Sequence, residues 1–204
     1  MTLSPVRLVH LGDATLLIPV AAAIALFLAL NRAWRLSLRW TVSFGAGLAL
    51  VIMSKIAFIG WGFGIEALAY KAVSGHAMLT AAVLPTMFQI ILWKQRNTIR
   101  HAGVAVGFAM AALVSGLLVR FGFHSWAEVI AGSALGASIS VPFLRAAAVA
   151  CQSVRVRPWT ITASATMLLL MQHVAALPLQ TWMTDTAAVL SGHEMPDSRR
   201  TRTD

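Results

Sequence analysis

Six long runs of apolar residues, separated by short polar stretches, dominate the pattern of this chain. The runs span residues 14–30, 41–59, 77–93, 102–119, 127–150 and 159–178. Each run is close to the roughly 20 residues that a helix needs to cross the hydrocarbon core of a bilayer. Because backbone polar groups cannot remain unpaired in lipid, runs of this kind form helices. The pattern predicts an all-α, polytopic membrane protein with about six transmembrane helices in a bundle.

Polar residues return at the C-terminal end, where the sequence contains Pro196 and a group of arginines. Terminal segments of this kind are poorly ordered unless they are tied down. We therefore predict one membrane-embedded helical domain over residues 1–184 and a polar, disordered tail over residues 185–204.

Glycines recur at a spacing of four within two of the apolar runs. The pairs are Gly103 with Gly107 and Gly132 with Gly136. Small residues at this spacing lie on one face of a helix and let a neighbouring backbone approach closely. We interpret both pairs as helix-packing contacts.

Composition agrees with placement in a membrane. Hydrophobic residues make up 58% of the chain and charged residues only 11%, against about 25% charged residues in an average soluble domain. The net charge of +9 suggests an acidic partner such as nucleic acid, but no single face gathers the charge. Basic residues instead concentrate in the first and third loops, at Arg32, Arg35, Arg39, Lys94, Arg96 and Arg100. The positive-inside bias makes these loops cytoplasmic, and we expect no nucleic-acid partner.

This orientation places both termini and the second and fourth loops on the outer face of the membrane. The first apolar run has one arginine before it and three soon after it, which reverses the charge order of a signal peptide. We therefore expect the first run to be a retained helix.

The outer loops contain the start signals of two helices. Ser74 precedes the third apolar run as a natural N-cap, which leaves Gly75 and His76 in the first turn. Ser125 precedes the fifth run, and Glu128 follows three residues later in the spacing of a capping box. Free N–H groups and the helix dipole at such N-termini favour a bound phosphate.

Further candidate residues belong to the same outer side. Lys55 and Arg120 bring positive charge there, and His124 adds a second imidazole. Each cation also has a structural interpretation, because Lys55 could extend to the interface and Arg120 could be an ordinary flanking charge. Two other histidines, His10 and His101, are interpreted as solvated loop residues. The combined set suits binding and attacking a phosphate dianion.

In this order and spacing, the motifs resemble those of the type 2 phosphatidic acid phosphatase family of membrane phosphatases. That family has Lys-x6-Arg-Pro, then Pro-Ser-Gly-His, then Ser-Arg-x5-His-x3-Asp. Lys55 matches the first lysine, Val73-Ser74-Gly75-His76 matches the second motif, and His124-x3-Glu128 matches the end of the third. The resemblance covers roughly residues 50–140 and is that of a divergent bacterial member.

The chain departs from the family pattern at its arginines. Gly62 and Phe63 stand where the first motif has Arg-Pro, and Val73 replaces the proline of the second. Leu118 stands at the arginine of the third motif, two positions before Arg120.

The resemblance implies a metal-independent phosphatase without a cofactor. His124 would attack phosphorus and form a phosphohistidine, Glu128 would orient its ring, and His76 would protonate the leaving group. Lys55, Ser74, Gly75 and Arg120 would bind the phosphate. The substrate would be a lipid phosphate or diphosphate in the bilayer, and the site would face the periplasm from the bacterial inner membrane.

Other functions remain open from the residues. The lost arginines favour a catalytically weak or inactive relative that binds a phosphorylated lipid or acts as a membrane scaffold. A serine hydrolase would pair Ser74 with His124, although Ala72 stands where such a site favours glycine. A haem protein would use His76 and His124 on facing helices.

Overall fold

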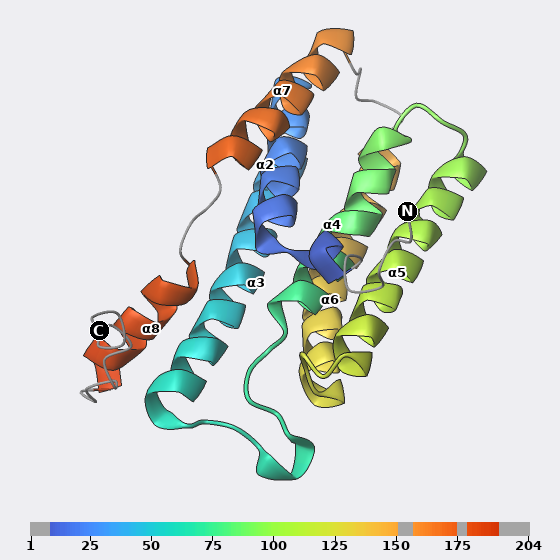
Figure 1. Cartoon of the computed structure of the whole chain (residues 1–204). Coiled ribbons are helices and arrows are strands. Elements are labelled where there is room, and N and C mark those ends of the chain that lie inside the picture. Colours follow the sequence, from blue (N-terminus) through green and yellow to red (C-terminus); the bar gives the residue numbers. More distant parts are fainter. Residues whose placement is uncertain (1–8, 151–156, 175–178, 192–204) are drawn as a thin grey trace, which may run out of the picture.

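A computed structural model of the chain describes residues 9–150, 157–174 and 179–191. Within these ranges every regular element is helical, and an isolated bridge joins Ile65 to Tyr70. In chain order the elements are η1 (His10–Gly12), α2 (Ala14–Leu30), α3 (Trp34–Trp61), η2 (Glu66–Leu68), α4 (Gly75–Ile91), α5 (Asn97–Arg120), α6 (Trp126–Ala150), α7 (Pro158–Val174) and α8 (Leu179–Ser191). The predicted all-α class is confirmed for the described residues (Figure 1).

The described helices include three, α3, α5 and α6, that are long and apolar enough to cross a membrane. Shorter apolar helices cover α2, α4 and residues Trp159–Leu170 of α7. Large apolar side chains on the long helices are exposed, for example Leu50 and Leu113. Apolar surface that faces outward is what a lipid environment requires, so the fold supports a membrane protein.

Helix α3 begins before the predicted second run, which started at residue 41. It starts at Trp34 and includes Arg35 and Arg39, which are exposed. Arginine is a good helix former, and its long side chain can reach polar surroundings while its backbone stays helical. The helix ends at Trp61 and is capped by Gly62, which has a φ of 69° in the left-handed region that favours glycine.

Helix α4 is the most enclosed helix of the described bundle, because α5 and α6 pack against it through glycines. A β-carbon at Gly107 would lie 2.5 Å from the Cα of Pro85 on α4. On α6, a β-carbon at Gly132 would clash with the carbonyl oxygen of Ser74, and a β-carbon at Gly136 would clash with that of Met78. The prediction that the spaced glycines are packing contacts is confirmed.

Two polar contacts fix the other helices around this core. The indole Nε1 of Trp40 on α3 donates to the carbonyl oxygen of Ala21 on α2 at 2.9 Å. The Asn31 amide, just after α2, donates to the hydroxyl of Thr160 on α7 at 2.9 Å. Its oxygen accepts from the Arg157 N–H at 2.9 Å, so Asn31 ties the start of α7 to the end of α2.

The predicted boundary of the C-terminal tail is wrong for its first residues. Residues 185–191 belong to α8, which runs from Leu179 to Ser191 and packs against α3. Ala187 is buried there, and a β-carbon at Gly60 of α3 would lie 3.4 Å from its carbonyl oxygen. Small residues at this contact let a rather polar helix dock. Residues 192–204 lie outside the described residues.

Candidate active site

The start of α4 is held by Ser74, as predicted. The Ser74 side chain is fully buried, and its hydroxyl oxygen accepts from the Ala77 N–H at 3.4 Å as the N-cap. The Ser74 N–H donates to the carbonyl oxygen of Glu128 at 3.2 Å. This contact joins the N-terminus of α4 to that of α6, with Gly75 and His76 in the first turn of α4.

The start of α6 carries the predicted capping box. The Glu128 N–H donates to the Ser125 hydroxyl at 3.3 Å, and the Ser125 N–H donates to Glu128 Oε2 at 3.1 Å. The other carboxylate oxygen, Oε1, accepts from the backbone N–H of Lys71 at 2.9 Å. Glu128 is 6% exposed, so this carboxylate is buried and accepts at both oxygens.

The turn between α5 and α6 brings His124 beside this carboxylate. Gly122 has a φ of 73°, the Phe123 N–H donates to the Leu118 carbonyl at 2.9 Å, and the Gly122 N–H donates to the Val119 carbonyl at 3.0 Å. These two bonds form a Schellman motif, which ends α5 and reverses the chain. His124 follows directly and precedes the first turn of α6.

The ring of His124 has one nitrogen committed to Glu128. Its Nδ1 lies 2.8 Å from Glu128 Oε2. An ionised carboxylate only accepts hydrogen bonds, so Nδ1 carries the proton and donates. In the neutral ring, Nε2 then keeps its lone pair, which is the arrangement that a nitrogen nucleophile requires.

The second histidine lies across from the first. The ring centroids of His76 and His124 are 6.3 Å apart, with an angle of 54° between the ring planes. Nε2 of His76 lies 2.9 Å from Oδ1 of Asp13, and Nδ1 of His10 lies 2.8 Å from Oδ2 of the same carboxylate. One carboxylate therefore joins two histidines from η1 and α4.

Sequence reasoning missed Asp13, and its interpretation of His10 as an ordinary solvated residue is incomplete. His10 is exposed, but it lies beside the cluster through Asp13. Asp13 occupies the N-cap position of α2 without making a side-chain cap bond. The sequence did contain a signal for Asp13, because it follows His10 by three positions on the side predicted to carry the site. His101 lies on α5 and not in a loop, although it is exposed as predicted.

A cavity of about 260 Å³ separates the histidines. Its lining combines polar residues from η1, α4 and the α5–α6 turn with apolar side chains. The lining residues are Val9, His10, Asp13, His76, Leu118, Phe123 and His124. The volume is several times the roughly 30 Å³ that one water molecule occupies, so the cavity has room for a group larger than water.

The two predicted cations lie outside this lining. Lys55 is half-buried on α3 and interacts electrostatically with Glu128. Arg120 is exposed at the end of α5. Leu118, which is 1% exposed, lines the cavity at the position where the resembling family has arginine. The structure thus brings His124, His76 and Glu128 together and leaves Arg120 apart.

The histidines and carboxylates of this site are residue types that can also bind metal ions. Within the described ranges, no three His, Cys, Asp or Glu side chains are grouped so that they could hold a metal ion. The hydrogen bonds above pair each imidazole with a carboxylate instead.

Comparison with known proteins shows similarity to a bacterial protein. The protein is 41% identical over 134 residues to a Klebsiella pneumoniae protein described as an uncharacterized 22.5 kDa protein in the cps region. The match covers 65% of this chain and 64% of the relative, so the chain spans less than two thirds of the relative's length. No protein-family model matches the chain. No solved structure is significantly similar to it.

Proposed function

We propose that this protein is a metal-independent membrane phosphatase that hydrolyses a lipid phosphate or diphosphate through a phosphohistidine intermediate. The observation that carries the proposal is the His124–Glu128 pair, which leaves Nε2 of His124 available, with the His76 ring 6.3 Å away beside a cavity. The motifs at these positions support membership of the type 2 phosphatidic acid phosphatase family, as a divergent bacterial member.

The proposed membrane arrangement has six spanning helices, α2 to α7. The lengths of α3, α5 and α6 and the apolar character of α2, α4 and α7 support it. The loops after α2 and α4 and the helix starts that follow them contain Arg32, Arg35, Arg39, Lys94, Arg96 and Arg100, which favours a cytoplasmic location for these loops. The candidate site then faces the periplasm from the inner membrane, at the depth of lipid headgroups.

The first chemical step is the attack of His124 Nε2 on phosphorus. The N–P bond forms while the bond from phosphorus to the leaving oxygen breaks. The leaving oxygen takes a proton from His76, whose charge as a doubly protonated ring the Asp13 carboxylate balances. Glu128 balances the positive charge that develops on His124.

The second step restores the enzyme. Water attacks phosphorus, His76 accepts a proton from it, and the N–P bond breaks. The products are inorganic phosphate and the free lipid alcohol from a lipid phosphate, or the lipid monophosphate from a diphosphate. The N-terminus of α4, beginning at Gly75 after the Ser74 cap, and the ammonium of Lys55 contribute positive potential for the phosphate oxygens.

A second candidate function is supported by a specific observation. Leu118 lines the cavity where the resembling family has arginine, and Arg120 is exposed. A site with fewer fixed cations stabilises the transition state less. A catalytically weak or inactive relative that binds a phosphorylated lipid, or acts as a membrane scaffold, is the alternative.

Phosphate release from lipid phosphates and diphosphates tests the proposal. The purified full chain, in detergent with a chelator, should release phosphate, and His124→Ala should abolish the release. Ser74→Ala should only reduce it, because the lost cap weakens the start of α4 by about 1 kcal/mol.

His101→Ala is the matched control, since His101 is exposed near the start of α5, away from the α5 end that adjoins the site. Phosphate release that survives His124→Ala would overturn the mechanism. Binding of the lipid phosphates without any release from the wild-type chain would establish the inactive relative instead.

A further inference from the structure

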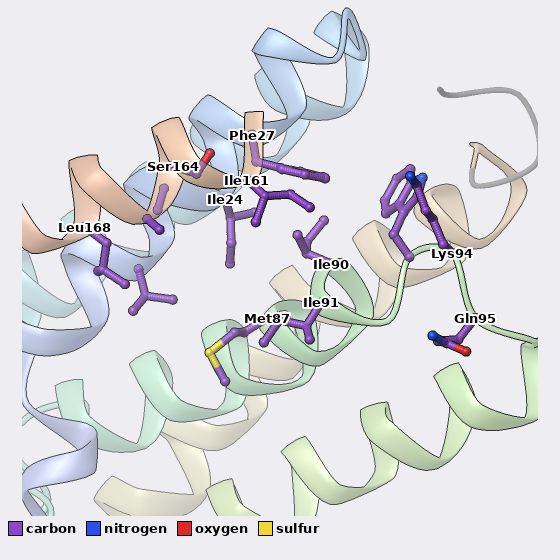
Figure 2. A pocket seen from close by; sticks show the side chains of 14 residues that line it. Ile24, Phe27, Met87, Ile90, Ile91, Lys94, Gln95, Ile161, Ser164 and Leu168 are labelled. Atoms are coloured by element: carbon purple, nitrogen blue, oxygen red, sulfur yellow. The ribbon is translucent and has the colours of Figure 1, made fainter. Parts of the chain in front are cut away.

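A second cavity lies at the opposite end of α4 from the candidate active site. Its volume is about 460 Å³, within the range of small-molecule sites. The walls come from α2, α4 and α7 and are mostly apolar, as Ile24, Phe27, Met87, Ile90 and Leu168 illustrate (Figure 2). Exposed Ile91 and Ile161 also line it, so the cavity opens on the side of the bundle.

Two polar groups in this apolar wall have no hydrogen-bond partner among the described residues. Nε1 of Trp93 is buried and unpaired in a side chain that is 4% exposed. The hydroxyl oxygen of Ser164 on α7 is likewise buried and unpaired. Unsatisfied buried polar groups are costly, and each is satisfied when a ligand supplies an acceptor.

A positive charge lies beside Trp93 in the lining of the cavity. Lys94 follows Trp93 directly and is one of the lining residues (Figure 2). It belongs to the basic loop between α4 and α5, which also contains Arg96. One cation, two hydrogen-bond donors and apolar walls suit the three kinds of group in an anionic phospholipid, which are a phosphate, ester carbonyls and an acyl chain.

We propose that this cavity binds one anionic phospholipid. The acyl chain lies against the apolar walls between α4 and α7, and the phosphate meets Lys94. The donors Trp93 and Ser164 bond to the ester carbonyls. The proposal does not depend on phosphatase activity, because the cavity shares no lining residue with the candidate active site.

Mass spectrometry of the intact, delipidated full chain with added lipid tests the site. Phosphatidylglycerol is compared with phosphatidylcholine that has the same acyl chains. The wild-type chain should retain phosphatidylglycerol about fivefold more tightly, the factor expected for one lysine near an anionic headgroup. Lys94→Gln should remove this preference, and Lys94→Arg should keep it.

Variants of the cavity walls distinguish the contribution of the acyl chain to binding from that of the headgroup. Ala165→Phe fills the cavity and should weaken retention of both lipids. Trp93→Phe removes the indole N–H without adding volume, so it should weaken retention of both lipids equally and leave the preference for phosphatidylglycerol unchanged. It also tests the site if Ala165→Phe fails to fold. Arg39→Gln is the charge control, because Arg39 is exposed on α3 and does not line the cavity.

Several results would overturn the proposal. One is equal retention of both lipids by the wild-type chain. Another is a preference unchanged in Lys94→Gln, and a third is undiminished retention by Trp93→Phe. Phosphate release measured on the same variants should equal that of the wild-type chain, which keeps this test separate from that of the proposed phosphatase.

Discussion

The two ends of α4 face two cavities that differ in whether their polar side chains have hydrogen-bond partners within the protein. At the N-terminal end, the imidazoles of His76 and His124 are each hydrogen-bonded to a carboxylate. At the C-terminal end, Trp93 Nε1 and the Ser164 hydroxyl are buried without a partner in the described part of the chain. Hydrogen bonds within the protein hold the histidine rings in one orientation, as a catalytic site requires. Unpaired donors in an apolar wall are instead satisfied when a ligand binds.

The largest effect expected at the N-terminal end is that of removing the nucleophile. His124→Ala should reduce phosphate release to background, since no N–P bond can form, whereas Ser164→Ala at the other end should leave release unchanged. Turnover with a lipid phosphate measures both. An equal loss in the two variants would mean that the ends are not functionally distinct.

Removal of the proton donor should have the next largest effect. His76→Ala should lower turnover by about 100-fold or more, the usual range for a general acid. A substrate whose leaving group needs no protonation should recover most of the loss. If such a substrate is equally slow, His76 holds the structure and does not transfer a proton.

The loss of the Asp13 carboxylate should have a smaller effect, because Asp13 is a positioning residue that acts through His76. We expect Asp13→Asn to lower turnover about tenfold, less than the roughly 100-fold or more expected for loss of the general acid itself. The loss should shrink for a substrate whose leaving group needs no protonation, because Asp13 acts through the proton donor His76. Asp185→Asn, at an exposed position on α8, is the control. An equal loss with both kinds of substrate would indicate a structural role alone.

Glycine packing offers a comparison of stability at the two ends. Near the active site, a β-carbon at Gly132 would meet the Ser74 carbonyl oxygen, which is backbone and cannot move aside. Near the apolar cavity, a β-carbon at Gly103 would meet the end of the Leu92 side chain, which can rotate. Gly132→Ala should therefore cost about 1–3 kcal/mol of stability, and Gly103→Ala much less. Thermal unfolding in detergent compares them, and equal costs would contradict the proposed difference.

The smallest effect should come from Arg120→Gln. Arg120 is exposed and does not contribute to the cavity lining, so we expect turnover to change less than about twofold, as for an isolated surface charge. Parallel assays with the wild-type chain measure this. A loss comparable to that of His76→Ala would return Arg120 to the phosphate site and strengthen the resemblance of the third motif.

The parts of the site that the sequence predicted are local. Ser74 as an N-cap and Ser125 with Glu128 as a capping box depend on residues no more than three apart. Most helix positions likewise followed from the length of apolar runs. Such predictions do not depend on tertiary contacts, because the hydrogen bonds they predict are made within one turn of helix.

The parts that the sequence did not predict depend on distant contacts. Asp13 meets His76 across 63 positions of the chain, and nothing near either residue specifies that approach. Arg120 was assigned to the phosphate by its position in the chain, but helix geometry decides where its side chain points. Residues 185–191 were assigned to a tail because they are polar, and their docking on α3 comes from tertiary packing.

The Glu128 carboxylate divides its two oxygens between His124 and the backbone of Lys71. Lys71 lies in the connection between α3 and α4, which extends away from the bundle and exposes Phe63, Ile65 and Leu68 (Figure 1). In the proposed membrane arrangement, these apolar side chains would reach the headgroup region of the bilayer. The proposed nucleophile, His124, would then be linked to the lipid surface through Glu128 and Lys71. Turnover should therefore differ between micelles and bilayers, and should vary with the lateral pressure of the bilayer.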